Sequence, residues 1–136
     1  MIKSSLLVLI ILISSCTILP PYVAPKENIV ELKIEELPDP WICINEKMFA
    51  LKADTKGNAK VPAGSRIVVG SRHHWEGYNV RYSCNPSISF VPKIGISYFS
   101  NWEVIDEACR VEIFQISDKN RVGLDFEKSA SRGWCG

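Results

Sequence analysis

The stretch Gly77–Cys84 (GYNVRYSC) carries the clearest structural pattern in the chain. Two sets of side chains alternate along it, Tyr78, Val80, Tyr82 and Cys84 against Asn79, Arg81 and Ser83. Successive residues of an extended chain point to opposite faces, so a period of two predicts a β-strand over 78–84.

Several other segments predict strands in the same way. They are Val30–Ile34, Arg66–Val69, Ser87–Val91 and Ile94–Phe99, a strand or hairpin over Trp41–Ala53, and a hairpin of Cys109–Ile113 with Val122–Phe126 around the turn Ser117–Asn120. One stretch differs, because Asn101–Arg110 (NWEVIDEACR) has helix-compatible composition and spacing. The sequence therefore predicts a mainly β protein, a small antiparallel barrel or sandwich with at most one short helix.

The segment Val61–Gly77 (VPAGSRIVVGSRHHWEG) resembles the opening of bacterial SH3-like domains. In that family a Pro-Ala-Gly-type turn leads into an apolar strand and then an aromatic residue. The resemblance implies an SH3-like topology as one possible form of the β fold.

The N-terminus has the features of an export signal. Lys3 precedes an uninterrupted apolar run, Leu6–Ile13, which is shorter than the roughly 20 residues that a membrane-spanning helix needs. The residues Ile13-Ser14-Ser15-Cys16 then resemble the lipobox of bacterial lipoproteins, with Ile13 and Ser15 departing from the commonest residues. This resemblance implies cleavage before Cys16 and acylation of that cysteine. Because the residue after the cysteine is Thr17 and not aspartate, it also implies the outer membrane.

The cysteine count agrees with this interpretation. Without Cys16 an even set remains, namely Cys43, Cys84, Cys109 and Cys135. None of these forms a CxxC pair of the kind that zinc or redox sites use, so two structural disulfides in an oxidising compartment are expected. Three pairings are possible, and Cys135 is expected to attach the C-terminal tail to the body of the domain.

Three regions are expected along the chain: a lipoprotein signal peptide over 1–15, a lipidated N-terminus with a Pro-rich tether over 16–27, and a disulfide-stapled β domain over 28–136. Pro20, Pro21 and Pro25 favour an extended conformation in the tether. Removing Lys3 with the signal leaves 15 Lys plus Arg against 15 Asp plus Glu. No basic excess is present for nucleic-acid binding.

No residue pattern in the chain predicts catalysis. His73 and His74 are the only histidines, and neighbours on a strand point to opposite faces, so they do not form a chelating pair. The GxSxG, SxxK and HExxH patterns are absent from the sequence. We therefore expect a non-enzymatic protein without metal or cofactor.

Aromatic and arginine side chains, which dominate binding hot spots, gather between residues 72 and 82. Arg72, Trp75, Tyr78 and Arg81 are the candidate binding residues, with Trp75 expected to be exposed beside the histidines. A second aromatic group, Tyr98, Phe99 and Trp102, is the alternative candidate, although most of these aromatics are expected to pack inside a small β domain. Trp134 is expected to pack on a disulfide.

These features favour a lipid-anchored outer-membrane protein whose periplasmic or surface domain binds another envelope protein. It would be an accessory part of a secretion or conjugation assembly, or a receptor-blocking exclusion lipoprotein. The alternative is a periplasmic inhibitor of a hydrolase, since the lipoproteins that inhibit c-type lysozymes are also small disulfide-containing β proteins. A third hypothesis, a cell-wall binding module or enzyme, rests on the SH3-like resemblance.

Overall fold

The computed structural model describes residues 18–136, which form strands and contain no helix. Cys16, the signal peptide and the lipobox-like residues lie outside the described part of the chain. Within that part, no helix is long and apolar enough to cross a membrane.

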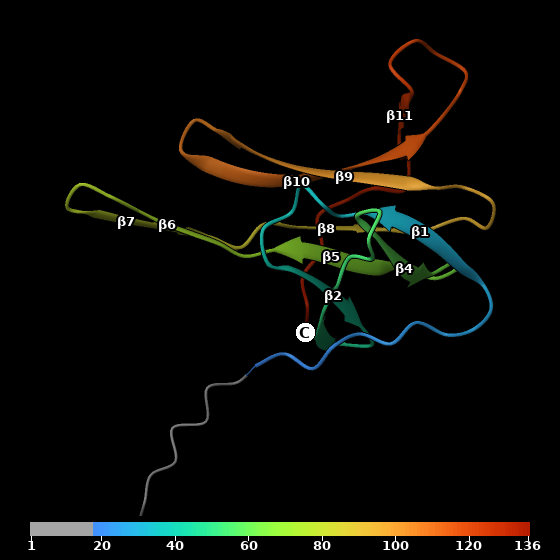
Figure 1. Ribbon diagram of the computed structural model, residues 1–136, viewed down its shortest axis with the longest axis horizontal. Coiled ribbons are helices and arrows are strands. Elements are labelled where there is room, and N and C mark those ends of the chain that lie inside the picture. Colours follow the sequence, from blue (N-terminus) through green and yellow to red (C-terminus); the bar gives the residue numbers. More distant parts are fainter. Residues whose placement is uncertain (1–17) are drawn as a thin grey trace, which may run out of the picture.

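Two sheets form the body of the protein, and a separate two-stranded hairpin projects from it (Figure 1). The larger sheet has the order β11-β10-β9-β1-β4, with β11 Leu124–Phe126, β10 Ala108–Ile116, β9 Tyr98–Ile105, β1 Ile29–Lys33 and β4 Asn58–Pro62. The smaller sheet has the order β3-β2-β5-β8, with β3 Lys47–Ala50, β2 Pro40–Ile44, β5 Ile67–Ser71 and β8 Ser87–Phe90. The hairpin consists of β6 His73–Gly77 and β7 Val80–Cys84.

The two larger sheets face each other as a sandwich and do not close into a barrel. Of the two architectures expected from the sequence, the sandwich is confirmed and the closed barrel is wrong. Among the described strands the pairs are antiparallel except β1–β9, which is parallel. The segment that resembles SH3-like domains contains the end of β4 and all of β5 and β6, and these strands belong to three different sheets.

The core lies between the sheets and comes from the inward-facing half of each alternating strand. Leu32 and Val61 of the larger sheet and Ile42, Val69 and Phe90 of the smaller one are completely buried. Removing this apolar surface from water is the main term that stabilises the sandwich.

Tyr98, from the second aromatic group, belongs to this core, where its ring packs beside Phe90 with 5.2 Å between the ring centroids. Its hydroxyl accepts a hydrogen bond from the backbone N–H of Lys93 at 2.9 Å. Burial raises the pKa of this phenol. Tyr98 is therefore a structural residue, as expected for most of the aromatics.

The C-terminal tail crosses the smaller sheet and is fastened to it. Ser131 forms a two-way backbone bridge with Ser89, and the Ser87 hydroxyl donates to the carbonyl of Gly133 at 2.6 Å. The disulfide Cys43–Cys135 then joins the tail to β2. The prediction that Cys135 attaches the tail to the domain is confirmed, and the second disulfide, Cys84–Cys109, completes the expected pair.

The short helix that the sequence allowed over Asn101–Arg110 does not form, because these residues form the end of β9, a tight turn and the start of β10. Asp106 and Glu107 both adopt positive φ, 49° and 66°, as a two-residue hairpin turn of the primed type requires. Trp102 and Val104 then lie across from Val111 and Cys109 on one face. The helical spacing of Trp102, Ile105 and Cys109 concealed this period of two.

The strand expected over 78–84 is only partly correct, since it begins at Val80. Tyr78 and Asn79 form the turn between β6 and β7, with Asn79 at a φ of 58°. Asparagine tolerates the left-handed region better than other non-glycine residues. Strand β4 was not expected from the sequence at all, because Asn58–Pro62 contains Lys60 and only two core residues, Ala59 and Val61.

Candidate functional site: the projecting hairpin

The β6–β7 hairpin leaves the sandwich sideways and shares no sheet with it (Figure 1). Its strands pair from His73 opposite Cys84 to Gly77 opposite Val80. An isolated two-stranded hairpin is at best marginally stable in water. Its order therefore depends on contacts at its root and on its own side-chain pairs.

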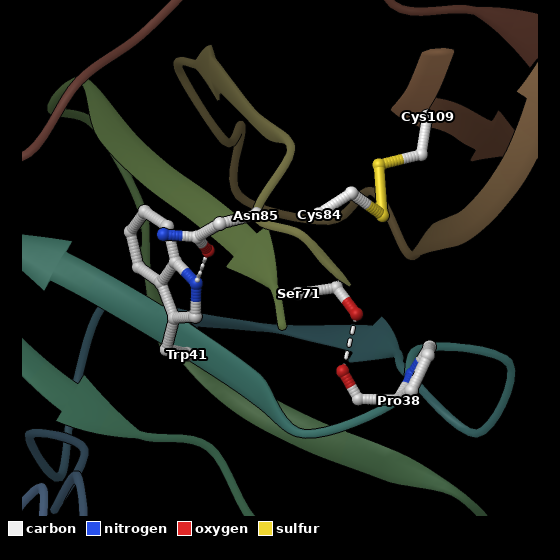
Figure 2. Close-up of a disulfide and its surroundings, with 6 residues drawn as sticks. All are labelled: Pro38, Trp41, Ser71, Cys84, Asn85 and Cys109. Atoms are coloured by element: carbon white, nitrogen blue, oxygen red, sulfur yellow. Dashed lines mark hydrogen bonds between the residues drawn. A yellow bond between two sulfur atoms is a disulfide. The ribbon is translucent and has the colours of Figure 1, made fainter. Parts of the chain in front are cut away.

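The first strand of the hairpin is fixed where it leaves the sandwich. The Ser71 hydroxyl donates a hydrogen bond to the carbonyl of Pro38 (Figure 2). The Ser71 N–H donates to Pro86 at 3.1 Å, and the Arg72 guanidinium lies 3.0 Å from the Asp39 carboxylate. These contacts set the direction in which β6 begins.

The second strand is fixed where it returns. The Trp41 indole donates from Nε1 to Oδ1 of Asn85 at 2.8 Å (Figure 2). Immediately before Asn85, Cys84 is joined to Cys109 of β10 by a disulfide that crosses from the hairpin to the larger sheet (Figure 2). Both strands of the hairpin are therefore fixed at the root, and only its outer part makes no contact with the sandwich.

One face of the hairpin carries a continuous row of neighbouring aromatic rings. Trp75 and Tyr82 lie opposite each other, with ring centroids 5.1 Å apart and planes inclined by 13°. His73 continues the row at 4.6 Å from Trp75, and Trp102 of β9 extends it at 4.4 Å from His73. Aromatic pairs of this kind contribute about 0.5–1.5 kcal/mol each beyond their burial. The row thus stiffens the hairpin and ties it to the β9–β10 hairpin.

The opposite face of the hairpin is polar. His74 and Glu76 alternate with the ring-bearing residues of β6, and Arg81 lies across from Glu76. The Arg81 Nε is 3.2 Å from a Glu76 carboxylate oxygen, with the arginine side chain 80% exposed. An ion pair this exposed contributes little to stability, so these charges are available to a partner.

The outer part of the hairpin exposes apolar surface. Tyr78 at the turn is 95% exposed, Tyr82 45% and Val80 44%. One edge of β7 has no neighbouring strand in the described part of the chain. Natural proteins usually shield such edges, because an open strand edge with apolar side chains invites pairing with another chain. An exposed edge on a rigid mount is suited to binding.

The structure brings the four candidate binding residues onto this one element and separates their roles. Tyr78 and Arg81 are exposed on the outer part, as a binding residue must be. Trp75 was expected to be exposed, but its ring stacks on Tyr82 and is half-buried. Arg72 lies at the root, where its contact with Asp39 gives it a positioning role.

Two residues of the surface were missed at the level of sequence. Val80 and Tyr82 were assigned to the strand over 78–84 but not to the candidate binding residues, and both are exposed on the hairpin. The dipeptide Tyr78-Asn79, between two short alternating runs, was the available signal of a turn. Trp134, expected to pack on a disulfide, is instead 81% exposed.

Residues 18–136 contain no group of three or more His, Cys, Asp or Glu side chains that could hold a metal ion. Comparison of the chain with protein-family models, with curated protein sequences and with solved structures gave no match. The candidate site is therefore defined by its geometry alone.

Proposed function

We propose that this protein is a non-enzymatic outer-membrane lipoprotein, acylated at Cys16, whose β-sandwich binds another envelope protein through the β6–β7 hairpin. The observation that carries the proposal is the exposure of Tyr78, 95%, at the end of a hairpin whose root is fixed on both strands. At this exposure the side chain buries almost no surface against the rest of the protein, so it is accessible to a partner.

Binding through a flexible element costs conformational entropy, because the element becomes ordered when the partner docks. A binding element that is already rigid loses little conformational freedom when its partner docks. The disulfide, the ring row and the root hydrogen bonds supply this rigidity, while the tip retains tyrosine, valine and arginine side chains for contact. Tyrosine and arginine are enriched in the residues that dominate binding energies.

The proposal is tested by affinity capture from gently solubilised envelopes of the native host, followed by mass spectrometry. The wild-type protein is compared with the double variant Tyr78→Ala, Tyr82→Ala and with Cys16→Ser. Val122→Ala is the matched control, because Val122 is also 80% exposed but lies in the loop between β10 and β11. We expect one envelope protein to be captured by the wild type and Val122→Ala and to be depleted in the tyrosine variant.

Equal capture by the tyrosine variant and the wild type would contradict the role of the hairpin. Unchanged membrane association of Cys16→Ser would contradict the anchor. Measured turnover of an envelope substrate by the purified protein would contradict the non-enzymatic assignment.

The same hairpin also favours a second function, inhibition of a hydrolase. A narrow, rigid hairpin with an aromatic tip has the shape needed to enter an active-site cleft, and its two strands are fixed at the root. Lysozyme activity measured with and without micromolar protein distinguishes the two functions. If the wild-type protein lowers lysozyme activity and the tyrosine variant does not, the inhibitor function is favoured.

A further inference from the structure

The N-terminal end of the described chain lies against the sandwich, although the sequence predicts a free tether there. Pro21 forms a parallel bridge with Ala50 at the end of β3. The Ala50 N–H donates to the carbonyl of Pro20 at 2.8 Å, and the Tyr22 N–H donates to the carbonyl of Ala50 at 2.9 Å. The Tyr22 ring meets the edge of Phe49, with centroids 5.7 Å apart. The segment thus pairs with the β3 edge of the smaller sheet through one isolated β-bridge.

This pairing leaves a very short connection to Cys16. Only Thr17, Ile18 and Leu19 separate that cysteine from Pro20. Even fully extended, this stretch spans about 14 Å between the Cα atoms of Cys16 and Pro20. A lipid on Cys16 would therefore hold the β3 side of the sandwich at the height of the lipid headgroups.

The surface around the docked segment has the side chains that such a position needs. Ile18 is 87% exposed and Val23 83%, although both are large apolar residues. A groove of about 650 Å³ runs beside the segment, and Lys26, Lys52 and Lys60 line it with Asp54 as the one acidic residue. Exposed apolar side chains beside lysines suit the boundary between headgroups and acyl chains, and lysines attract anionic lipids.

We propose that the docked segment orients the protein, so that the β3 edge and the lysine-lined groove rest on the bilayer that carries the Cys16 lipid. This inference rests on the proposed acylation of Cys16. The bilayer is the occupant of this surface because the chain from the anchor ends here and the groove is basic.

The orientation decides what a partner can reach. The loop between β10 and β11 lies on the opposite side of the molecule from the docked segment, and the β6–β7 hairpin leaves sideways (Figure 1). Both therefore remain in water when the β3 edge is on the membrane. The short connection keeps the hairpin near the membrane surface, where a partner would be another membrane-associated protein.

The test supplies the anchor chemically, so that it does not depend on acylation in cells. The oxidised chain 16–136 has one free thiol, Cys16, which is coupled to a maleimide lipid in vesicles containing anionic phospholipid. Lysine acetylation by a water-soluble reagent is then quantified at each residue by mass spectrometry. The uncoupled protein in solution is the reference. Lys26 and Lys52 report on the groove, and Lys119, in the loop between β10 and β11, is the internal control.

We expect acetylation of Lys26 and Lys52 to slow several-fold on coupling while acetylation of Lys119 is unchanged. Inserting a flexible stretch of glycine and serine between Cys16 and Thr17 is expected to restore the reactivity of both lysines. The variant Tyr22→Ala, which removes the ring contact with Phe49, should weaken the protection without changing the melting temperature greatly.

If each of the three lysines were acetylated at the same rate in the coupled and the uncoupled protein, the proposed orientation would be overturned. Protection of Lys119 in place of Lys26 and Lys52 would overturn it as well. Acylation of Cys16 is measured separately, from the mass of the N-terminal peptide isolated from cells. An unmodified peptide there would refute the anchor, which the vesicle experiment does not test.

Discussion

At the scale of single residues, Gly70 shows how closely the smaller sheet is packed. The Trp41 indole lies flat over this glycine, so a methyl group at position 70 would overlap the ring. The same indole donates the hydrogen bond to Asn85 that fixes the hairpin root. A change at Gly70 therefore acts on both the sheet and the hairpin.

We expect Gly70→Ala to lower the free energy of unfolding by about 1–3 kcal/mol, the usual cost of overpacking a filled site. The matched control is Gly77→Ala, where the nearest side-chain atom lies 3.8 Å from the added carbon, an ordinary contact. Urea unfolding measures both variants. A Gly70→Ala protein as stable as the wild type would show that Trp41 does not occupy this position.

Glu127 is a buried carboxylate whose ionisation should matter for stability. Burial alone would raise its pKa, but hydrogen bonds from Gln115 and Ser129 outweigh this effect and leave the pKa below its ordinary value. A lowered folded-state pKa means that the ionised form stabilises the fold. This stabilisation is fully present above the unfolded-state pKa and is lost as the pH falls through the folded-state pKa.

We expect Glu127→Gln to be less stable than the wild type at neutral pH and to approach it in stability below the folded-state pKa. The check is the free energy of unfolding in urea, measured from neutral pH down to about pH 2 for both proteins. Parallel curves for the two proteins over this range would refute the role of the Glu127 carboxylate.

At the scale of elements, the β6–β7 hairpin depends on Cys84–Cys109. This disulfide closes a loop of 25 residues, which corresponds to about 3.5 kcal/mol in the chain-entropy model. It is also the covalent link between the hairpin and the larger sheet. Without it, the row from His73 to Trp102 and the root hydrogen bonds alone would hold the hairpin.

For the double variant Cys84→Ser, Cys109→Ser we expect amide hydrogens of residues 73–84 to exchange rapidly, while those of β1 and β2 stay protected. Hydrogen exchange followed by mass spectrometry or NMR measures this difference. If the amide hydrogens of the hairpin stayed protected, the aromatic row would be sufficient to keep the hairpin folded without the disulfide.

Some elements were predictable from the sequence and others were not, for identifiable reasons. The half-buried β1 displays its alternation directly, as Val30 and Leu32 against Glu31 and Lys33. The β9–β10 turn was not recognised, because it uses Asp106 and Glu107 in place of the usual Asn-Gly or Asp-Gly. For β6–β7, alternation located β7, but the pattern cannot distinguish a strand that faces the core from one that faces water.

At the scale of the whole molecule, Cys43–Cys135 closes a loop of 92 residues and joins the C-terminal tail to β2. In the chain-entropy model a loop of this length corresponds to about 4–5 kcal/mol, more than the shorter loop contributes. We expect Cys43→Ser, Cys135→Ser to lower the melting temperature more than Cys84→Ser, Cys109→Ser does. Calorimetry of the two double variants measures the order, and a reversed order would contradict this assignment.

The sequence predicted the number of disulfides and the sandwich as one of two architectures. It did not predict which strands pair with one another. Strand β1 pairs with β4 on one side and with β9 on the other, and these contacts join residues far apart in the chain. Such pairings depend on which faces pack together, which local alternation does not encode. The clustering of Arg72, Trp75, Tyr78 and Arg81 on one element was predictable, because they are close in sequence.

Contact between the tip of the β6–β7 hairpin and a protein partner is tested by site-specific photocrosslinking in living cells of the native host. A photoreactive amino acid is placed at Tyr78 in one strain and at the control position Val122, which is also largely exposed, in another. We predict one discrete covalent adduct with an envelope protein from position 78 and none from position 122. Adducts from position 122 alone, or from neither position, would contradict the account.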